Sequence, residues 1–404
     1  MYNMVRWTET KDFEAMKKSP LGIIFLTIFL DLLGFGIVLP QLPVYAEKFG
    51  ASGRVVGLLG ASYSLTQFLF APLWGRLSDR VGRRPVLMFS TLGLGLSYIL
   101  FGVAHNLPLL FISRLWAGMA AANIATAQAY IADVTDEKHR AQGMALVGIG
   151  FGLGFILGPA VGGWLGHYGG NAAIGFTAAG LSLLNFLWIA LCLPESLAVR
   201  QESAERFRFF DVRTVVATLK MPGVGLVIIL GFFAVLAFAN VEWTCGLFLM
   251  EQLGYNHQTV QKPLGYLFTY MGVIAVLVQG TMRFWGKRTT EQMLVVEGTL
   301  CIAVGLWLVP AAHNLMSLLP MLALLAVGRG LNDPSLSSLV SKLSPTETRG
   351  AVLGVYQSMS SLARIVGPAW GGFFFDRGVH LPFHTASMLM AVAFLLSLKL
   401  LTVK

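Results

Sequence analysis

Long apolar stretches alternate with short polar ones along the whole chain. Each apolar stretch is close to the ~20 residues that a helix needs to cross the hydrocarbon core of a bilayer. The pattern therefore predicts twelve membrane-spanning helices and little other regular structure. The predicted spans begin near Leu21, Val55, Pro85, Leu107, Ala141, Ala172, Gly223, Leu264, Gln292, Leu315, Gly350 and Leu381.

The longest polar stretch, 194–220, separates six predicted spans from the other six. We expect an N-terminal six-helix bundle over 1–198, a cytoplasmic linker over 199–221 and a C-terminal six-helix bundle over 222–404. The linker mixes basic, acidic and phenylalanine residues, which favours an amphipathic segment on the membrane surface. The first apolar run is too long for a signal-peptide core and lacks a small-residue cleavage site, so we interpret it as a retained span.

Composition supports an all-α membrane protein. Hydrophobic residues make up 55% of the 404 positions and charged residues only 12%, whereas soluble domains carry about 25% charged residues. The three cysteines all lie in apolar runs without metal-ligand spacing. We expect them to pack as small hydrophobic side chains, and we expect no metal site.

The distribution of the +9 net charge predicts the orientation in the membrane. Lysine and arginine concentrate in the segments on the same side as the N-terminus. The loops on the other side hold only Lys48, Arg54, Lys262 and Arg377. The positive-inside rule then places both termini in the cytoplasm of a multi-pass inner-membrane protein. Anionic membrane lipids account for the positive charge, so no nucleic-acid partner is required.

The two halves of the chain repeat. Arg140 precedes a Gly-Pro-x-x-Gly-Gly segment at 158–163, and Arg349 precedes the same segment at 367–372, so both features recur 209 positions later. Parallel repeats of this kind are typical of secondary transporters, which bind substrate between the halves near the bilayer midplane. Duplication in a non-transporting membrane receptor remains an alternative.

A charged segment, Gly75–Leu87, lies between the second and third predicted spans. So much charge is excluded from hydrocarbon, which predicts a short polar loop. Gly75 and Gly82 would permit a tight reversal, and Pro85 suits the first turn of the next helix. A loop that only sets the topology is the simpler alternative, although Asp79 and the glycines add nothing to a topology signal.

Four segments resemble known transporters. Gly75–Leu87 resembles the loop 2–3 signature of the major facilitator superfamily, and Arg114–Gly118 is similar to its span-4 arginine motif. Gly154–Gly163 resembles the span-5 motif of its twelve-span drug–proton antiporters, and Phe29–Pro40 resembles the first span of tetracycline-efflux-like members. The second copy of the loop signature, at 280–288, lacks the aspartate.

The resemblance implies the major facilitator fold with two pseudo-symmetric bundles. It also implies a monomeric, proton-coupled antiporter that exports lipophilic or cationic small molecules by alternating access. A symporter or facilitator for a metabolite is the alternative within transport, and the span-5 motif disfavours it. In the implied gate, Asp79 meets the first turn of the eleventh span and latches the outward-facing state. The implied gating residues are Gly75, Asp79, Arg80, Gly82, Arg83, Arg84 and Asp133.

Glycine recurs every fourth residue from 150 to 166 and predicts one small-residue face on the fifth span. Plain helix packing explains part of this pattern, and Pro159 permits a kink. The resemblance implies in addition that this face meets the other half and seals one side of the cavity. The antiporter-motif residues are Gly154, Gly158, Pro159, Gly162 and Gly163. In the eleventh span Arg364 stands where Phe155 stands in the fifth, and its role is open.

Two acids and one arginine within the spans are candidates for proton coupling. Asp31 lies about midway along the first span, where a carboxylate must be paired, solvated or protonated. Arg114 in the fourth span also needs a partner. We expect Asp31 to take up the proton and Arg114 to influence it directly or through water, and a structural buried pair is the alternative. Glu242 is either a substrate or second proton site or a hydrated residue at a cavity mouth.

Polar residues within spans normally turn inward, which selects candidates for the substrate surface. They are Tyr63, Gln67, Asn123, Gln128, Asn240, Trp243 and Tyr270. Arg329 and Asp333 have the i, i+4 spacing of a local ion pair. The chain has no nucleophile elbow, metal-ligand pattern or phosphate-binding loop. We therefore expect no enzyme and no cofactor, and expect a proton gradient to be the energy source.

Overall fold

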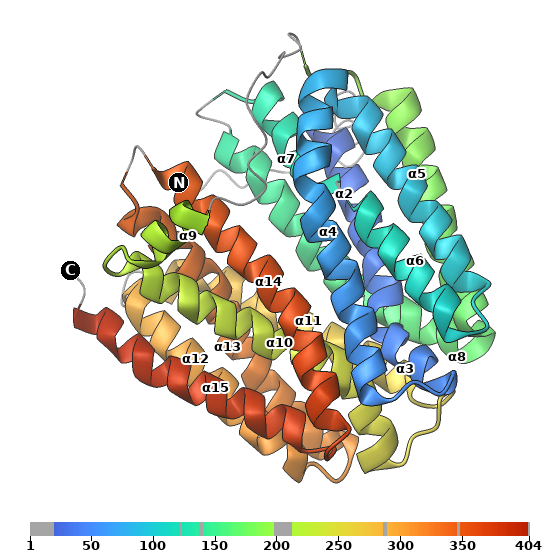
Figure 1. The fold of residues 1–404 in the computed structure, drawn as a ribbon, viewed down its shortest axis with the longest axis vertical. Coiled ribbons are helices and arrows are strands. Elements are labelled where there is room, and N and C mark those ends of the chain that lie inside the picture. The colour runs from blue at the N-terminus through green and yellow to red at the C-terminus, as the bar shows by residue number, and fades with distance from the viewer. Residues whose placement is uncertain are drawn as a thin grey trace, which may run out of the picture.

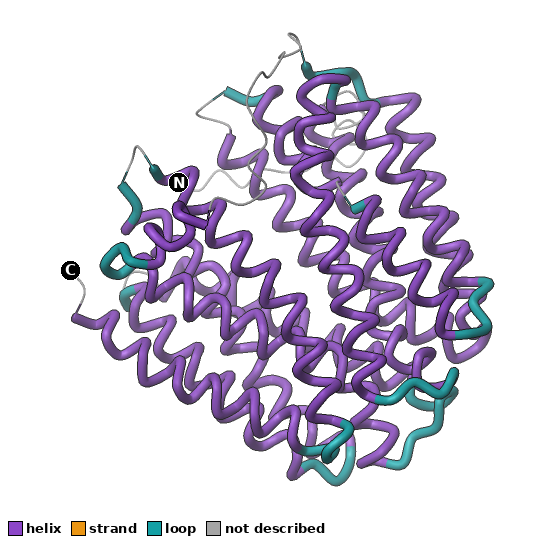
Figure 2. The backbone as a smooth tube through the Cα atoms, in the orientation of Figure 1, coloured by secondary structure: helices purple, strands orange, loops and turns teal. Residues whose placement is uncertain are grey.

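The computed structural model describes residues 20–121, 123–136, 140–197, 212–285, 289–345 and 348–402. All regular structure in these ranges is helical, which confirms the predicted class (Figure 2). The helices are α2 (Pro20–Val38), η1 (Leu39–Gln41), α3 (Leu42–Lys48), α4 (Gly53–Val81), α5 (Arg83–Gly102), α6 (Leu107–Ala120), α7 (Asn123–Val134), α8 (Arg140–Cys192), α9 (Val212–Leu219), α10 (Val224–Leu253), α11 (Gln261–Trp285), α12 (Glu291–Leu308), η2 (Val309–Ala311), α13 (Leu315–Leu343), α14 (Arg349–Phe375), α15 (Leu381–Ser397) and η3 (Leu398–Thr402).

Ten helical segments within the described ranges are long and apolar enough to cross a membrane. One of them, in α8, contains two of the predicted spans, because Gly170 breaks the helix with a backbone φ of 66°. Only glycine adopts this left-handed conformation without strain. The eleventh predicted span corresponds to α14, which has 27 residues, carries Arg349 and Arg364, and is not among these ten.

The helices form two groups that pack mainly within themselves (Figure 1). Helices α2 to α8 form one group, in which α2 packs on α8 and α4 on α6. Helices α9 to α15 form the other, in which α12 packs on α13 and α10 on α14. Each group has an apolar core made mostly of its own residues, although Val44 of α3 packs in the core of the second group and Trp243 and Leu247 of α10 pack in that of the first. Of the predicted linker, only 212–221 lies within the described residues.

Contact between the two groups runs mainly through α4 with α14 and α8 with α11. A Cβ atom at Gly57 would strike the carbonyl of Pro368, and one at Gly60 would strike the ring of Trp243. Trp243, on α10, also packs in the apolar core of the first group. We call this end of the molecule, where α4 begins, the closed end. Val81, at the other end of α4, lies about 40 Å away at the helical rise of about 1.5 Å per residue.

The glycine face of α8 is turned mostly toward its own group. A Cβ atom at Gly154 would strike Leu32 of α2, and one at Gly158 would strike Gly36. The expectation that this face meets the other half is therefore wrong for most of its length, and only Gly166 at its end lies against Gln261 of α11. The neighbouring face also contacts the other half, because Gly163 lies against Gln261 and Gly265 of α11. The 3.6-residue period explains the difference, since residues four apart share a face but Gly163 lies about 100° from Gly162.

Candidate functional site

A cavity of about 960 Å³ lies between the two groups of helices. Its volume falls at the upper end of the roughly 300–1,000 Å³ range typical of small-molecule sites. At one end it stops at Gly60 and Trp243 of the closed end; at the other it extends to Ala145, near the start of α8, and Gly280, near the end of α11. Among the described residues, its charged lining consists of Asp31, Glu242, Arg329, Asp333 and Arg364.

Asp31 lies on α2 and is only 8% exposed. Its exposed surface faces this cavity. The side-chain amide of Asn185, on the second part of α8, donates a hydrogen bond of 2.8 Å to Asp31 Oδ1. The same amide donates to the carbonyl of Thr27, one turn earlier on α2. The carboxyl group is thus held in place between two helices while it keeps access to the cavity.

Arg114 lies on α6 and is buried. Its Nε donates to Ser113 Oγ at 3.3 Å, and its guanidinium lies 5.9 Å and 5.6 Å from the ring centres of Tyr98 and Phe101. The described contacts of Arg114 are thus with Ser113 and these two rings, and the alternative of a buried pair with Asp31 stays open. Its Nη2 has no hydrogen-bond partner among the described residues. An influence of Arg114 through water stays a prediction.

The second half of the chain supplies most of the cavity's charge. Glu242, on α10, lines the wall beside Trp243. Arg329 and Asp333, on α13, form the predicted ion pair, with Nε to Oδ2 at 3.0 Å. The Arg329 guanidinium also lies 3.4 Å from the ring centre of Phe238. The i, i+4 prediction for this pair is confirmed.

The predicted substrate residues divide into two sets. Tyr63, Gln67 and Trp243 line the cavity, and the side chain of Asn123 lies outside the described residues. Gln128, Asn240 and Tyr270 are absent from the cavity lining in the described ranges, which corrects that expectation.

Asn240 shows why a polar residue within a span need not line the cavity. Its amide donates at 2.9 Å to the carbonyl of Pro382 on α15. An inward-facing polar side chain can thus serve a neighbouring backbone group instead of a ligand.

Sequence reasoning selected Tyr63 but missed the three phenylalanines that form an aromatic wall with it, on the first group of helices. Phe151 and Phe155, on α8, stack with ring centres 6.3 Å apart. Phe35, on α2, lies 6.2 Å from Phe155 and 5.5 Å from Tyr63. All four line the cavity. The i, i+4 spacing of the two α8 phenylalanines was the available signal, but it does not distinguish a cavity wall from a lipid-facing surface.

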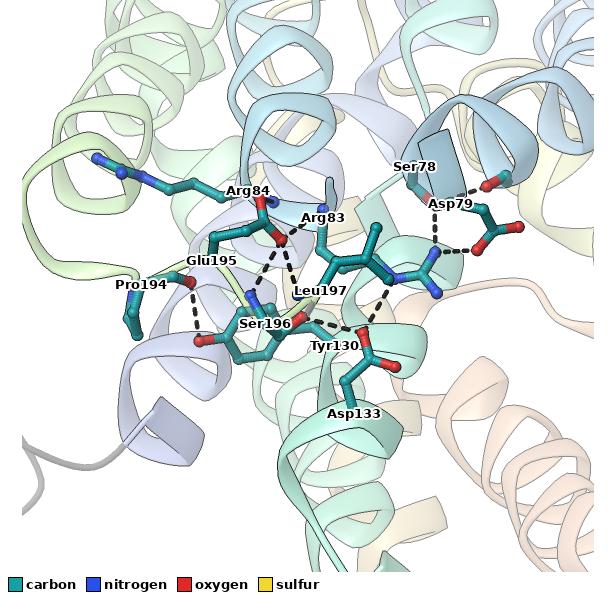
Figure 3. A network of polar contacts seen from close by, with 11 residues as sticks. Ser78, Asp79, Arg83, Arg84, Tyr130, Asp133, Pro194, Glu195, Ser196 and Leu197 are labelled. Carbon is teal, nitrogen blue, oxygen red and sulfur yellow. Dashed lines mark hydrogen bonds and ion pairs between the residues drawn. The ribbon is translucent and has the colours of Figure 1, made fainter. Parts of the chain in front are cut away.

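At the end of α4 farthest from the closed end, Arg83 forms the centre of a polar network (Figure 3). Its Nη1 lies 2.5 Å from Asp79 Oδ1 and donates to Ser78 Oγ at 2.7 Å, while its Nε lies 3.1 Å from Asp133 Oδ2. The network joins α4, α5 and α7. We call it the Arg83 network.

The charged segment Gly75–Leu87 is almost entirely helical, whereas we expected a loop. Helix α4 continues through Gly75 to Val81, and α5 begins at Arg83, so Gly82 alone reverses the chain, with a φ of 113°. The predicted turn at Gly75 is wrong, because the intervening Arg and Leu residues are good helix formers and long arginine side chains can extend to water. Pro85 lies in the first turn of α5, as predicted.

The structure brings together Asp79, Arg83 and Asp133 but not Asp79 and α14. In the described ranges α4 meets α14 near the opposite end of α4, around Gly57. Arg84 donates to the carbonyl of Ala190, within its own group. The latch between Asp79 and the start of α14 stays a prediction for another conformation.

Glu195, which the sequence analysis did not select, caps α5. Its carboxylate accepts from the backbone N–H groups of Arg83 at 2.8 Å and Arg84 at 3.2 Å (Figure 3). Gly82, at the N-cap position, has no side chain to provide this bond. Because Glu195 is more than 100 positions away along the chain, no local pattern could reveal the contact.

We expect the Glu195→Ala variant to be less stable by about 1–3 kcal/mol, because two N–H groups at the start of α5 lose a charged acceptor. Thermal unfolding of the purified protein in detergent should then show a lower midpoint. Glu195→Gln keeps one acceptor oxygen and should lose less. An unchanged midpoint for Glu195→Ala would contradict the capping role.

Several polar contacts bridge the two groups of helices at the closed end. The Asp376 carboxylate, just after α14, accepts from the backbone N–H of Gly53 at 2.6 Å and of Arg54 at 3.1 Å. Arg54 Nε lies 3.2 Å from the same carboxylate. Glu47, at the end of α3, pairs with His257, which precedes α11. Asp376 therefore caps the first turn of α4 from the opposite group.

Comparison with known proteins agrees with this architecture. The chain is 33% identical to the class E tetracycline resistance protein of Escherichia coli over 356 residues, covering 86% of each chain. It is 27% identical to multidrug resistance protein 2 of Bacillus subtilis, covering 93% of this chain and 94% of that protein. A solved human organic anion transporter is 26% identical and superimposes with a TM-score of 0.68 over 93% of this chain and 98% of that one.

The family model of the Major Facilitator Superfamily matches residues 24–368 and, in a second match, 292–404. These matches span both groups of helices and every residue of the cavity lining. Proteins of this family are membrane transporters and not enzymes. The chain belongs to the Major Facilitator Superfamily.

Proposed function

We propose that this protein exports lipophilic small molecules across the inner membrane in exchange for protons. The cavity is the observation that carries the proposal, because it is large enough for a drug-sized ligand and has two acids, Asp31 and Glu242, in its wall. A carboxyl group that lines a cavity at membrane depth is a candidate proton carrier. The similarity to tetracycline and multidrug resistance proteins supports export of such molecules.

We propose alternating access as the mechanism, with the two groups of helices rocking around the cavity. The basic residues around Arg83 then lie in the cytoplasm, by the positive-inside rule. In that orientation the closed end faces outward and the cavity extends toward the cytoplasm. The structure would thus represent an inward-facing state, and opening it outward would require breaking the Asp376 and Glu47 contacts.

The proposal requires only protons, a small molecule and the lipid bilayer as partners. The scheme needs one chain only, because the cavity and its described charged groups lie within a single chain. No cofactor enters the scheme, since the proton gradient provides the driving force.

Reconstitution into liposomes tests the proposed function. With a pH-sensitive dye enclosed, addition of tetracycline should cause protons to move in the direction opposite to the drug, and liposomes without protein should show no such movement. Proton movement in the same direction as the drug would indicate symport. Drug movement that a pH gradient does not accelerate would contradict proton coupling.

A further inference from the structure

Arg364 occupies an unusual position. It lies near the middle of α14, one turn before the Gly367–Pro368 pair, where α14 packs on α4 and α10. Although this is the centre of the molecule, the residue is exposed, and its exposed surface lines the cavity. An arginine is always charged, so a cation faces the cavity at membrane depth.

The nearby acids do not neutralise Arg364 by direct contact. Asp333 pairs with Arg329, and Asp31 lies on the other group of helices, bonded to Asn185. Glu242 interacts electrostatically with Arg364. Within the described part of the chain, however, Arg364 forms no ion pair or hydrogen bond. Its guanidinium can therefore present up to five N–H donors to a ligand.

The wall formed by Phe35, Tyr63, Phe151 and Phe155 gives the other half of a binding site. The near-parallel rings of Phe151 and Phe155, with an interplanar angle of 16°, offer an extended apolar surface to a planar ring system. Tyr63 connects the two sides, since it belongs to this wall and also interacts electrostatically with Arg364.

We propose that the cavity binds amphipathic organic anions, with an acidic group of the substrate on Arg364 and its ring system against Phe35, Phe151 and Phe155. The proposal rests on the proposed transport function and specifies its substrate class. A planar guanidinium binds carboxylate, sulfonate or enolate oxygens through two parallel hydrogen bonds, which an ammonium group cannot do. Glu242, which lines the same cavity and interacts electrostatically with Arg364, weakens this binding when it is ionised, because it repels the substrate's negative charge.

A matched pair of dyes tests the charge preference. Fluorescein is an anion and rhodamine 123 a cation, and both have a xanthene ring system of similar size. Their binding to the purified protein in detergent can be measured by fluorescence polarisation, without any gradient. We expect Arg364→Gln to weaken fluorescein binding by roughly 10- to 100-fold, the range for loss of a charged hydrogen-bonding partner. Rhodamine 123 binding should be unchanged or tighter.

Two further variants distinguish charge from folding. Arg364→Lys keeps the charge without the planar fork and should fall between wild type and Arg364→Gln. Glu242→Gln removes the opposing carboxylate and should strengthen fluorescein binding a few-fold. Arg349→Gln is the matched control, because Arg349 is on the same helix but does not line the cavity, and it should bind both dyes like wild type.

Three outcomes would overturn the inference: no fluorescein binding by wild type, equal binding by wild type and Arg364→Gln, or preferential rhodamine binding that Glu242→Gln abolishes. Failure of the proposed function is recognised separately. If fluorescein binds through Arg364 but a pH gradient drives no transport, proton-coupled export is wrong and the anion site stands. If rhodamine 123 is exchanged for protons but fluorescein does not bind, the anion site is wrong and proton-coupled export stands.

Discussion

Asp31→Asn should reduce pH-gradient-driven transport to the level of liposomes that contain no protein. The amide cannot take up and release a proton, and Asp31 is the acid that the structure holds between α2 and α8 at the cavity wall. The variant should still fold, because the asparagine side chain keeps an oxygen that accepts from Asn185. Substrate binding, measured without a gradient, should therefore persist.

A second acid provides the control for this experiment. Glu297, on α12, lies within a predicted span but outside the cavity lining. Glu297→Gln removes a carboxylate of the same chemistry and should transport like wild type. Retained pH-driven transport in Asp31→Asn would remove this residue from the proton path. In that case Glu242→Gln would show whether the acid on the opposite wall carries the proton instead.

The sequence predicted the helices well because hydrophobic stretches of membrane length leave few alternatives. Helices α6, α13 and α15 begin at Leu107, Leu315 and Leu381, as predicted. The prediction of a turn at Gly75 was wrong because a polar sequence does not by itself end a helix. A helix can extend beyond the apolar region into water. Composition marks the edge of the hydrocarbon but does not mark the end of the helix.

The candidate site was less predictable, because it depends on which side chains meet across helices. Asp31 and Glu242 could be selected, since a lone acid in a span is costly and needs a reason. Asn240 looked equivalent but bonds to a neighbouring backbone carbonyl. Arg364 could be recognised as a departure from the repeat. Its place in the cavity could not be predicted, because it depends on how α14 packs on the other helices. Glu195 depended entirely on a tertiary contact.

Asp376→Asn should open the closed end of the molecule. The Asp376 carboxylate is the acceptor for the first turn of α4, and helix N-termini favour negative charge. Hydrogen bonds to charged groups contribute about 1.5–3 kcal/mol each. Weakening this cap should shift the equilibrium between the proposed inward-facing and outward-facing conformations by roughly tenfold, since a tenfold change corresponds to about 1.4 kcal/mol.

Spin labels at positions 48 and 251 can measure the shift. Lys48 and Glu251 are exposed near the closed end, one on each group of helices. In a protein whose three native cysteines are replaced by alanine, double electron–electron resonance should show a longer-distance population that increases in Asp376→Asn.

The Arg54→Gln variant distinguishes the contribution of the Asp376 helix cap from that of the Arg54–Asp376 ion pair. Arg54 is 55% exposed, and exposed ion pairs contribute only about 0–1 kcal/mol. This variant leaves both backbone N–H groups bonded to Asp376, so its distance distribution should stay close to that of wild type. If Arg54→Gln shifts the distribution as far as Asp376→Asn does, the ion pair holds the closed end. If neither variant shifts it, the packing of Gly57 on Pro368 and of Gly60 on Trp243 is sufficient to keep the two groups together.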